Sequence, residues 1–379
     1  MTEPVAAGTA LIERCHRELI APLLPAGQPL WDVHAHLGED DDGSALDAEL
    51  LLSQARQFGV SRTFVFPFRQ SGPDAYRDRN DAVIAAAAGS DGELIPLCRV
   101  EPGEGDVAEL ERAIHAGARG IKLHPLTGRF EVGHRLVAAA LAVAEERGVP
   151  VLLHAGRGIA TFAAELEPML VRHPGAQVIL AHAGIGDQEA AIDVAARHAN
   201  LVFDVAVWNL LDIRALVARV APEQILYGTD APYYGHACSQ AKLMLALGSA
   251  PGGTLHAREM LWGNAARVAE GHSPDALSEP IGPVAAAVDY RRLRAHEYLL
   301  ACVPLVWTCQ PDLLKALPLA RHAVGAPENA ELEAACEMID LAATCWAHEL
   351  EQGSRREVLS LSWTTFRLLE FADALIYCS

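Results

Sequence analysis

The stretch LWDVHAHL (residues 30–37) is a short apolar run with two histidines near its end. Its length and its content of Trp, Val and Leu predict a buried β-strand. Similar runs bounded by turn residues follow, and successive runs start about 23 to 32 residues apart. Together they are LWDVHAHL from 30, RTFVFPF from 62, ELIPLCRV from 93, ARGIKLHP from 118, VPVLLHAG from 149, AQVILAHAG from 176, NLVFDVAV from 200 and EQILYGTDAP from 223.

Longer segments with Ala, Leu and Val at helical spacing separate these eight strand candidates. Alternation of strand and helix over residues 28–272 matches the size and order of an α/β chain that closes into a (β/α)8 TIM barrel. An open doubly wound sheet that binds a dinucleotide would carry a glycine-rich loop after its first strand. The sequence there is the acidic HAHLGEDDDG (34–43). We therefore predict a TIM barrel.

Helical segments are predicted on both sides of the barrel. Residues 1–27 predict an N-terminal helical extension, and residues 283–379 lack strand candidates and predict an all-helical C-terminal appendix. The segment EGHSPDALSEPIGP (270–283) is rich in Pro, Ser and Gly, as is typical of a linker. The apolar faces of the appendix require cover from one another, from the barrel or from a second copy in a homodimer; a lid over the active site is the alternative. Helical periodicity predicts helices near 284–301, 312–323, 328–350 and 355–377.

The composition argues against several classes of protein. A net charge of −19 would repel a phosphate backbone, so we expect no nucleic-acid partner. The sequence has no run of about 20 apolar residues that would span a membrane. Residues 1–20 predict an amphipathic helix rather than a secretion signal, so we expect a cytoplasmic protein. The eight cysteines are scattered without a CxxC pair, and we expect reduced core residues rather than a thiolate nucleophile or a zinc-thiolate site.

Polar side chains gather at the predicted C-terminal ends of the strands. His34 and His36 end the first strand, His154 the fifth, His182 the sixth and Asp230 the eighth. These ends share one rim of a barrel, where enzymes of this fold place their active sites. Residues two apart on a strand face the same side, so the first pair can bind one cation together. A single histidine at a strand end is usually structural, but the joint pattern predicts a divalent metal site.

The order of the motifs DVHAHLG, GIKLHP, LLHAG, LAHAG and LYGTDAP, closed by WGNAARV (262–268), resembles the amidohydrolase superfamily. The similarity is greatest to its branch of amidohydrolase-related hydrolases and enzymes of the aminocarboxymuconate-semialdehyde decarboxylase type, and it covers about residues 28–272. The resemblance implies one divalent metal ion, usually zinc. Histidine and carboxylate ligands also suit manganese or iron. The implied ligands are His34, His36, His154 and Asp230, with His182 beside the metal-bound water or as an additional ligand.

A site of this kind suits hydrolysis. Bound zinc lowers the pKa of its water from about 15.7 toward about 7 and polarises a substrate carbonyl. Asp230 can then take the proton as general base, with His182 orienting or assisting it. We expect a metal-dependent hydrolase in which metal-bound hydroxide attacks a small amide, lactone or related acyl substrate. The alternatives are a metal-dependent non-oxidative decarboxylase of a small carboxylic acid, and a barrel without catalysis that serves as a binding or scaffold protein.

Basic residues near the predicted mouth are candidates for substrate binding. Lys122 and His124 share one face of the fourth strand, and we expect both to contact the substrate. In binuclear members of the superfamily a carboxylated lysine on this strand bridges two metal ions, so Lys122 is also a candidate ligand. Arg157 after the fifth strand, like Arg69 after the second, could clamp a substrate carboxylate. A solvated loop arginine is the plainer interpretation of either residue.

Overall fold

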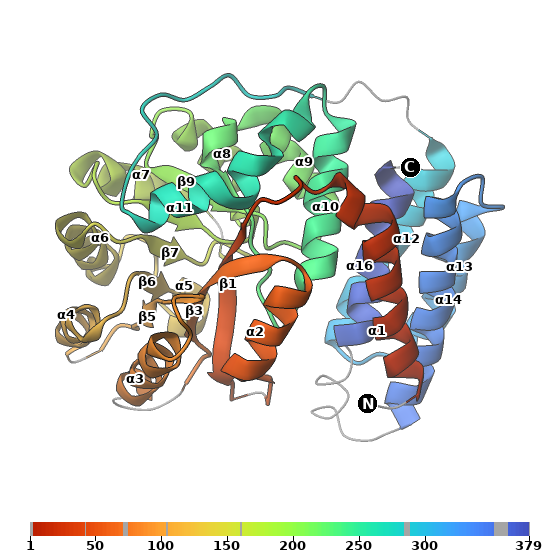
Figure 1. Cartoon of the computed structure of the whole chain (residues 1–379), viewed down its shortest axis with the longest axis horizontal. Coiled ribbons are helices and arrows are strands. Elements are labelled where there is room, and N and C mark those ends of the chain that lie inside the picture. The colour runs from red at the N-terminus through yellow and green to blue at the C-terminus, as the bar shows by residue number, and fades with distance from the viewer. Residues whose placement is uncertain are drawn as a thin grey trace.

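The computed structural model describes residues 3–41, 43–70, 75–103, 105–159, 161–283, 289–351 and 363–378. These residues form a barrel of strands and surrounding helices, with a separate group of helices beside it (Figure 1). The strands are β1 (Leu30–Glu39), β2 (Ala45–Leu46), β3 (Val60–Pro67), β4 (Leu94–Pro96), β5 (Cys98–Arg99), β6 (Ile121–Leu123), β7 (Val151–Leu153), β8 (Val178–Leu180), β9 (Leu201–Asp204) and β10 (Ile225–Leu226).

Parallel pairing places the barrel strands in chain order. β1 pairs with β3 and β3 with β4, and a second sheet runs from β5 through to β10. β4 and β5 are two parts of the predicted third strand, and β2 is a short antiparallel addition to β1. The barrel closes where the N–H of Val33 donates to the carbonyl of Tyr227 at 3.0 Å. A second closing bond runs from the N–H of His36 to the carbonyl of Ala231 at 2.8 Å. The predicted (β/α)8 TIM barrel is confirmed.

Helices alternate with the strands, and most of them lie around the outside of the barrel (Figure 1). Local signals set their ends. The carboxylate of Asp47 accepts the N–H of Leu50 at 2.8 Å and caps the first of them. Gly148 adopts a φ of 63° and lets the chain turn away from another. The barrel helices are α2 (Ala48–Gln57), α3 (Ala75–Ala88), α4 (Asp106–Ala116), α5 (Pro125–Gly128), α6 (Arg135–Arg147), α7 (Ala163–Arg172), α8 (Gln188–Ala195), α9 (Leu210–Arg219), α10 (His236–Ser249) and α11 (Asn264–Ala269).

An irregularity in β1 changes which side chains face the inside of the barrel. Trp31 and Val33 belong to an apolar cluster inside the barrel. The register of β1 against β3 shifts just after Asp32. Regular pairing resumes at Ala35, so His34 lies within the irregular segment and His36 follows it; both side chains line the cavity described below. Irregularities of this kind re-aim side chains beside active sites. The prediction that the two histidines share one face is confirmed.

The C-terminal helices and the N-terminal helix form a bundle beside the barrel (Figure 1). The predicted helices are present, although one ends at Trp307 instead of near residue 301. Residues 352–362, which include the predicted start of the last helix, lie outside the described residues. The division of the chain into three domains stays a prediction. The bundle helices are α1 (Glu3–Cys15), α12 (Tyr290–Trp307), α13 (Leu313–Val324), α14 (Ala330–Glu351) and α16 (Trp363–Cys378).

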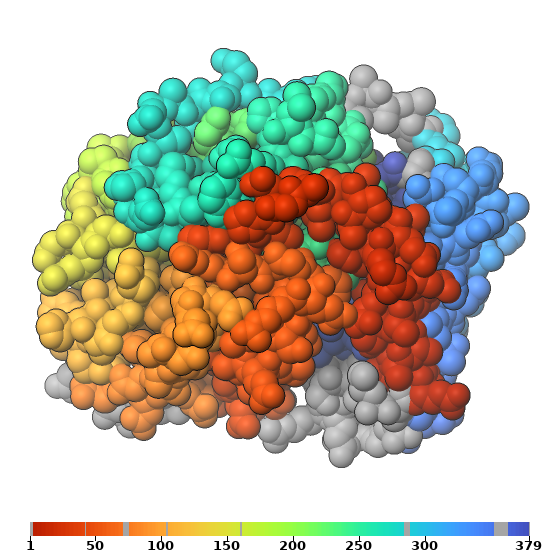
Figure 2. All heavy atoms as spheres, viewed as in Figure 1, coloured from red at the N-terminus to blue at the C-terminus, as the bar shows by residue number. Residues whose placement is uncertain are grey.

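Helix α1 packs closely against the C-terminal helices. At Gly8 a Cβ atom would lie 2.7 Å from Cγ2 of Thr364 and 3.4 Å from Sγ of Cys345, so the missing side chain permits this approach. Figure 2 shows the N-terminal segment, in red, lying between the barrel and the blue C-terminal helices. Leu11 and Ile12 of this segment belong to the apolar core of the bundle. The N-terminal extension is therefore joined to the C-terminal helices by packing.

Two further predictions concern composition. None of the helices in the described part of the chain combines the length and the hydrophobicity that a membrane crossing requires. All eight cysteines lie in this part of the chain and carry free thiols, and most of them are buried. The interpretation of the cysteines as reduced core residues agrees with this placement.

Candidate metal centre

The predicted metal ligands converge at one end of the barrel. His34 and His36 lie on β1, while His154, His182 and Asp230 follow β7, β8 and β10. All five side chains line one cavity of about 490 Å³. The other residues that line it are Asp40, Asp41, Arg69, Arg99, Lys122, His124, Thr127, Tyr233 and Trp307.

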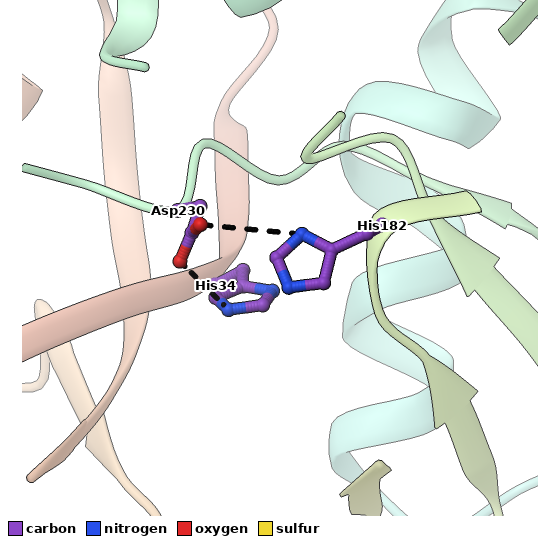
Figure 3. Close-up of side chains that lie close together, drawn as sticks. All are labelled: His34, His182 and Asp230. Atoms are coloured by element: carbon purple, nitrogen blue, oxygen red, sulfur yellow. Dashed lines mark ion pairs between the residues drawn. The ribbon is translucent and has the colours of Figure 1, made fainter. Parts of the chain in front are cut away.

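Three of the five residues form a compact group. His34, His182 and Asp230 each offer a ligand atom, and these atoms lie within 4.8 Å of one another. In Figure 3 the carboxylate of Asp230 faces both imidazole rings. Its Oδ1 lies 3.1 Å from Nε2 of His34, and its Oδ2 lies 4.0 Å from Nδ1 of His182. Two imidazoles and one carboxylate are a donor set that suits a divalent metal ion.

The other two predicted ligands extend this group on either side. Nε2 of His36 lies 3.1 Å from Oδ1 of Asp230. Nδ1 of His154 lies 3.0 Å from Nε2 of His182. The second ring nitrogens of His36 and His154 are buried and have no hydrogen-bond partner among the described residues. A metal ion would supply a partner for such a nitrogen.

The hydrogen bond on the far side of the His34 ring agrees with a cation at the site. The carboxylate of Asp204 accepts a hydrogen bond from Nδ1 of His34 at 2.7 Å, so a neutral His34 carries its lone pair on Nε2. This lone pair faces a carboxylate oxygen of Asp230 at 3.1 Å. Two acceptors at this distance repel each other unless a cation or a proton lies between them. The geometry of His34 therefore agrees with a metal site.

Burial sets the protonation of these groups. It lowers the pKa of His34, His36 and His154 well below the ordinary value, so the imidazoles are neutral at pH 7. Neutral imidazole is the form that binds a metal ion. Burial also raises the pKa of Asp230 well above its ordinary value and lowers the pKa of Lys122 to about 7. The attraction between the two groups shifts each pKa in the opposite direction, but burial has the larger effect. A cation beside Asp230 would favour its ionised form.

The sequence interpretation missed two buried aspartates that support the centre. Asp204 also accepts the backbone N–H of His182 at 2.8 Å. Asp32 accepts the backbone N–H of His34 at 3.0 Å and the hydroxyl of Thr229 at 2.5 Å, and burial raises its pKa to about 7. A carboxylate that receives the second N–H of a ligating imidazole fixes its tautomer. A signal was present, because each aspartate interrupts an otherwise apolar strand run, LWDVHAHL or NLVFDVAV.

Two residues of the centre have unusual backbone conformations. His182 has a φ of 58° and Asp230 has a φ of 52°, both in the left-handed region. A side chain makes this region unfavourable, and such residues persist only where the surrounding structure holds them. Outliers of this kind cluster at functional sites. The sharp turns at the ends of β8 and β10 bring these two side chains into the cavity.

The predicted substrate-binding residues differ in their placement. Nζ of Lys122 lies 3.5 Å from Nε2 of His34. The ring of His124 stacks on His154, with centroids 3.7 Å apart, and both Lys122 and His124 line the cavity. Arg157 is exposed and is not among the residues that line the cavity; its guanidinium lies over the ring of Trp208, 4.7 Å from the centroid. The proposed contacts of these residues with a substrate stay predictions.

Other lining residues were missed. Arg99 is 1% exposed and donates to Thr127 Oγ1 at 2.6 Å and to Glu101 Oε1 at 3.1 Å. A signal for it exists, since an arginine interrupts the apolar run ELIPLCRV. Trp307 lies at the end of α12, and no local pattern indicated that this helix reaches the cavity. Helix α12 therefore contributes Trp307 to the wall of the site, and a lid over the active site stays a prediction.

Comparisons with known proteins identify the family. A family model described as amidohydrolase matches residues 31–268. The chain is similar to the 3'-5' ssDNA/RNA exonuclease TatD of Dickeya dadantii (strain 3937), with 28% identity over 220 residues that cover 54% of this chain and 78% of that protein. TatD of Pectobacterium carotovorum subsp. carotovorum (strain PC1) is 30% identical over 132 residues, which cover 34% of this chain and 49% of that protein.

A solved structure shares the fold. The 2,6-dihydroxybenzoate decarboxylase from Rhizobium has a TM-score of 0.50 and 13% sequence identity, and the match covers 64% of this chain and 99% of that chain. The residues matched by the family model make up more than half of the chain and include all the predicted metal ligands. The predicted resemblance to the amidohydrolase superfamily is confirmed. The chain belongs to the amidohydrolase family, whose members are metal-dependent enzymes.

Proposed function

We propose that this protein is a metal-dependent hydrolase that acts on a small amide, lactone or related acyl substrate. The observation that carries this proposal is the position of Asp230, whose Oδ1 lies 3.1 Å from Nε2 of both His34 and His36 at the mouth of the barrel. A divalent cation held among these groups acidifies water and polarises a carbonyl. We favour one zinc ion, with manganese or iron as alternatives.

The proposed ligands are His34, His36, His154 and Asp230, with His182 as an additional ligand or beside the attacking water. Asp230 acts as the general base: its carboxylate receives the proton of the water and returns it to the leaving atom. His182 cannot turn freely, because its Nδ1 donates to the backbone carbonyl of Ala206 at 2.6 Å. This bond leaves Nε2 of His182 as an acceptor that faces His154 at 3.0 Å.

Lys122 is proposed to contact the substrate. Its ammonium group is 3.5 Å from Nε2 of His34 and 4.5 Å from the ring centroid of Phe66. From this position it can donate to an oxygen on which negative charge develops during the reaction. The second proposed contact is His124, whose ring stacks on His154. The eight free thiols agree with a reducing compartment, and we propose a cytoplasmic location.

A second candidate function is non-oxidative decarboxylation of a small carboxylic acid. Three cationic side chains, Arg69, Arg99 and Lys122, line the same cavity and could orient a substrate carboxylate. In this reaction the cationic side chains would bind the carboxylate of the substrate, and water would not attack. The carbon that loses the carboxyl group would take up a proton.

An oxygen-18 experiment separates the two reactions. Metal-loaded protein is incubated in H2(18)O with a panel of amides, lactones and small carboxylic acids, and the products are analysed by mass spectrometry. Hydrolysis predicts one solvent oxygen in the product acid and no carbon dioxide. Release of carbon dioxide without solvent oxygen in the organic product would overturn the hydrolase proposal in favour of decarboxylation. The Asp230→Asn variant is the control for background reaction.

A further inference from the structure

The turn that carries Asp230 lies against the last helix of the chain. The N–H of Tyr233 donates to the backbone carbonyl of Asp230 at 2.9 Å and closes a turn over residues 230–233. Helix α16 lies beyond the residues that match the family model, yet it packs on α10, the helix that follows this turn (Figure 1). Contacts between α16 and the turn therefore connect the bundle with the metal centre.

Arg367 of α16 makes the polar contacts with this turn. Its guanidinium donates through Nη2 to the carbonyl of Pro232 and through Nε to the carbonyl of Tyr233 at 3.4 Å. The chain next to these carbonyls is shaped for the guanidinium, because a Cβ atom at Gly235 would lie 3.3 Å from Nε of Arg367. One cationic side chain thus binds two consecutive carbonyls that directly follow Asp230 and Ala231.

Aromatic side chains on the same face of α16 pack around this contact. The ring of Trp363 meets Tyr233 edge to face, with centroids 5.0 Å apart. The ring of Phe366 lies 5.8 Å from that of Tyr234. Tyr233 in turn meets His36 edge to face at 5.5 Å. Residues three and four apart share one face of a helix, so Trp363, Phe366 and Arg367 contact the turn and the residue after it from the same face of α16.

We propose that α16 supports the metal centre, with Arg367 as the positioning residue that holds the Asp230 turn so that the carboxylate faces His34 and His36. The inference rests on the metal site of the proposed function. Asp230 has a φ of 52°, an unfavourable conformation that requires support from its surroundings. Removal of the guanidinium leaves two carbonyls without their cationic donor, so the turn relaxes and the carboxylate moves relative to the imidazoles.

The test measures metal binding in the full-length protein without any substrate. Zinc affinity is measured by competition with a chromogenic chelator, and the visible spectrum of the cobalt-loaded protein reports the number and geometry of ligands. We compare wild type with Arg367→Met and Arg367→Lys. The control is Asp373→Asn, which removes the charge of a buried carboxylate on α16 that lies 2.7 Å from Nδ1 of His296, and which leaves the turn untouched. Circular dichroism and thermal unfolding show whether each variant is folded.

We expect Arg367→Met to weaken zinc binding about 10- to 100-fold and to change the cobalt spectrum, as loss of a group that orients a ligand does. Arg367→Lys keeps a cation but not the planar set of donors of a guanidinium, so its zinc affinity should lie between that of the wild type and that of Arg367→Met. If Arg367→Met does not fold, the lysine variant must still show a loss. Wild-type affinity and spectrum in either folded variant, or an equal loss in Asp373→Asn, would overturn the inference. A wild-type protein that binds neither ion would instead overturn the proposed function and the inference together.

Discussion

Substitution of Asp204 by asparagine changes the tautomer of a proposed ligand while it preserves shape. Oδ1 of Asp204 accepts the backbone N–H groups of His182 at 2.8 Å and Ala206 at 3.0 Å. The amide oxygen of asparagine can keep both bonds. The amide nitrogen then takes the place of Oδ2, which lies 2.7 Å from Nδ1 of His34. A donor at that place requires Nδ1 to accept, and the proton of the imidazole moves to Nε2, where the metal would bind.

The size of the effect follows from the lost interaction. A hydrogen bond to a charged group contributes about 1.5 to 3 kcal/mol, and each 1.4 kcal/mol changes an equilibrium constant about tenfold. Asp204→Asn should therefore weaken metal binding by about 10- to 100-fold. Without a metal ion, the amide nitrogen of the asparagine can still donate to Nδ1 of His34 in place of the original bond, so the unfolding midpoint of the apoprotein should change little.

The assay is a competition between the apoprotein and a chromogenic zinc chelator at pH 7, with circular dichroism as the test of folding. The control is Asp193→Asn, which makes the same change in net charge at a side chain that is 73% exposed on α8. It should keep the affinity of the wild type. A folded Asp204→Asn variant whose zinc affinity stays within about threefold of the wild type would refute the assignment of His34 as a ligand through Nε2.

Four other outcomes are expected. Asp230→Asn should lower kcat by about 10²- to 10⁴-fold without loss of fold, measured with the best substrate of the panel. Removal of metal by chelation should abolish activity and lower the unfolding midpoint, and zinc at 100 times its Kd should restore about 2.7 kcal/mol. Burial lowers the pKa of His236 to about 3, so only the unfolded state binds its proton between there and about 6.5. The free energy of unfolding should therefore fall as the pH falls below about 6.5, and less so in His236→Gln, measured by urea titration at pH 7 and pH 5. A labelled single-stranded DNA should neither bind nor be cleaved at about 0.15 M salt, because a net charge of −19 repels it; saturable anisotropy would contradict this.

The barrel and the convergence of its histidines could be predicted because both depend on local periodicity and on one topological rule. Apolar runs at regular spacing indicate strands, and the C-terminal ends of parallel strands meet at one rim. His34, His154 and Asp230 were found in this way, although they are far apart along the chain. Strand lengths were less predictable. The predicted strand at 149–156 is observed only over Val151–Leu153.

The supporting residues were harder to find, because a buried charge in a strand has no periodic signal of its own. Asp204 was read as part of an apolar run, yet burial of a carboxylate requires partners that compensate the loss of water. Its partners are His34, His182 and Ala206, which come from three different segments of the chain. An interrupting aspartate in a strand can thus be noticed in a sequence, whereas the group that it orients depends on the closed barrel.

Contacts from the bundle to the barrel depend on tertiary packing alone. Trp307 and Arg367 lie on amphipathic helices whose patterns predict only that one face is buried. Their actual neighbours are the cavity and the Asp230 turn, and both lie more than 70 residues away along the chain. Helix α16 lies outside the residues that match the family model, yet it supports the strained turn of Asp230. The C-terminal helices therefore contribute to the metal centre as well as to the bundle. Loss of α16 should therefore weaken metal binding as well as the packing of the bundle.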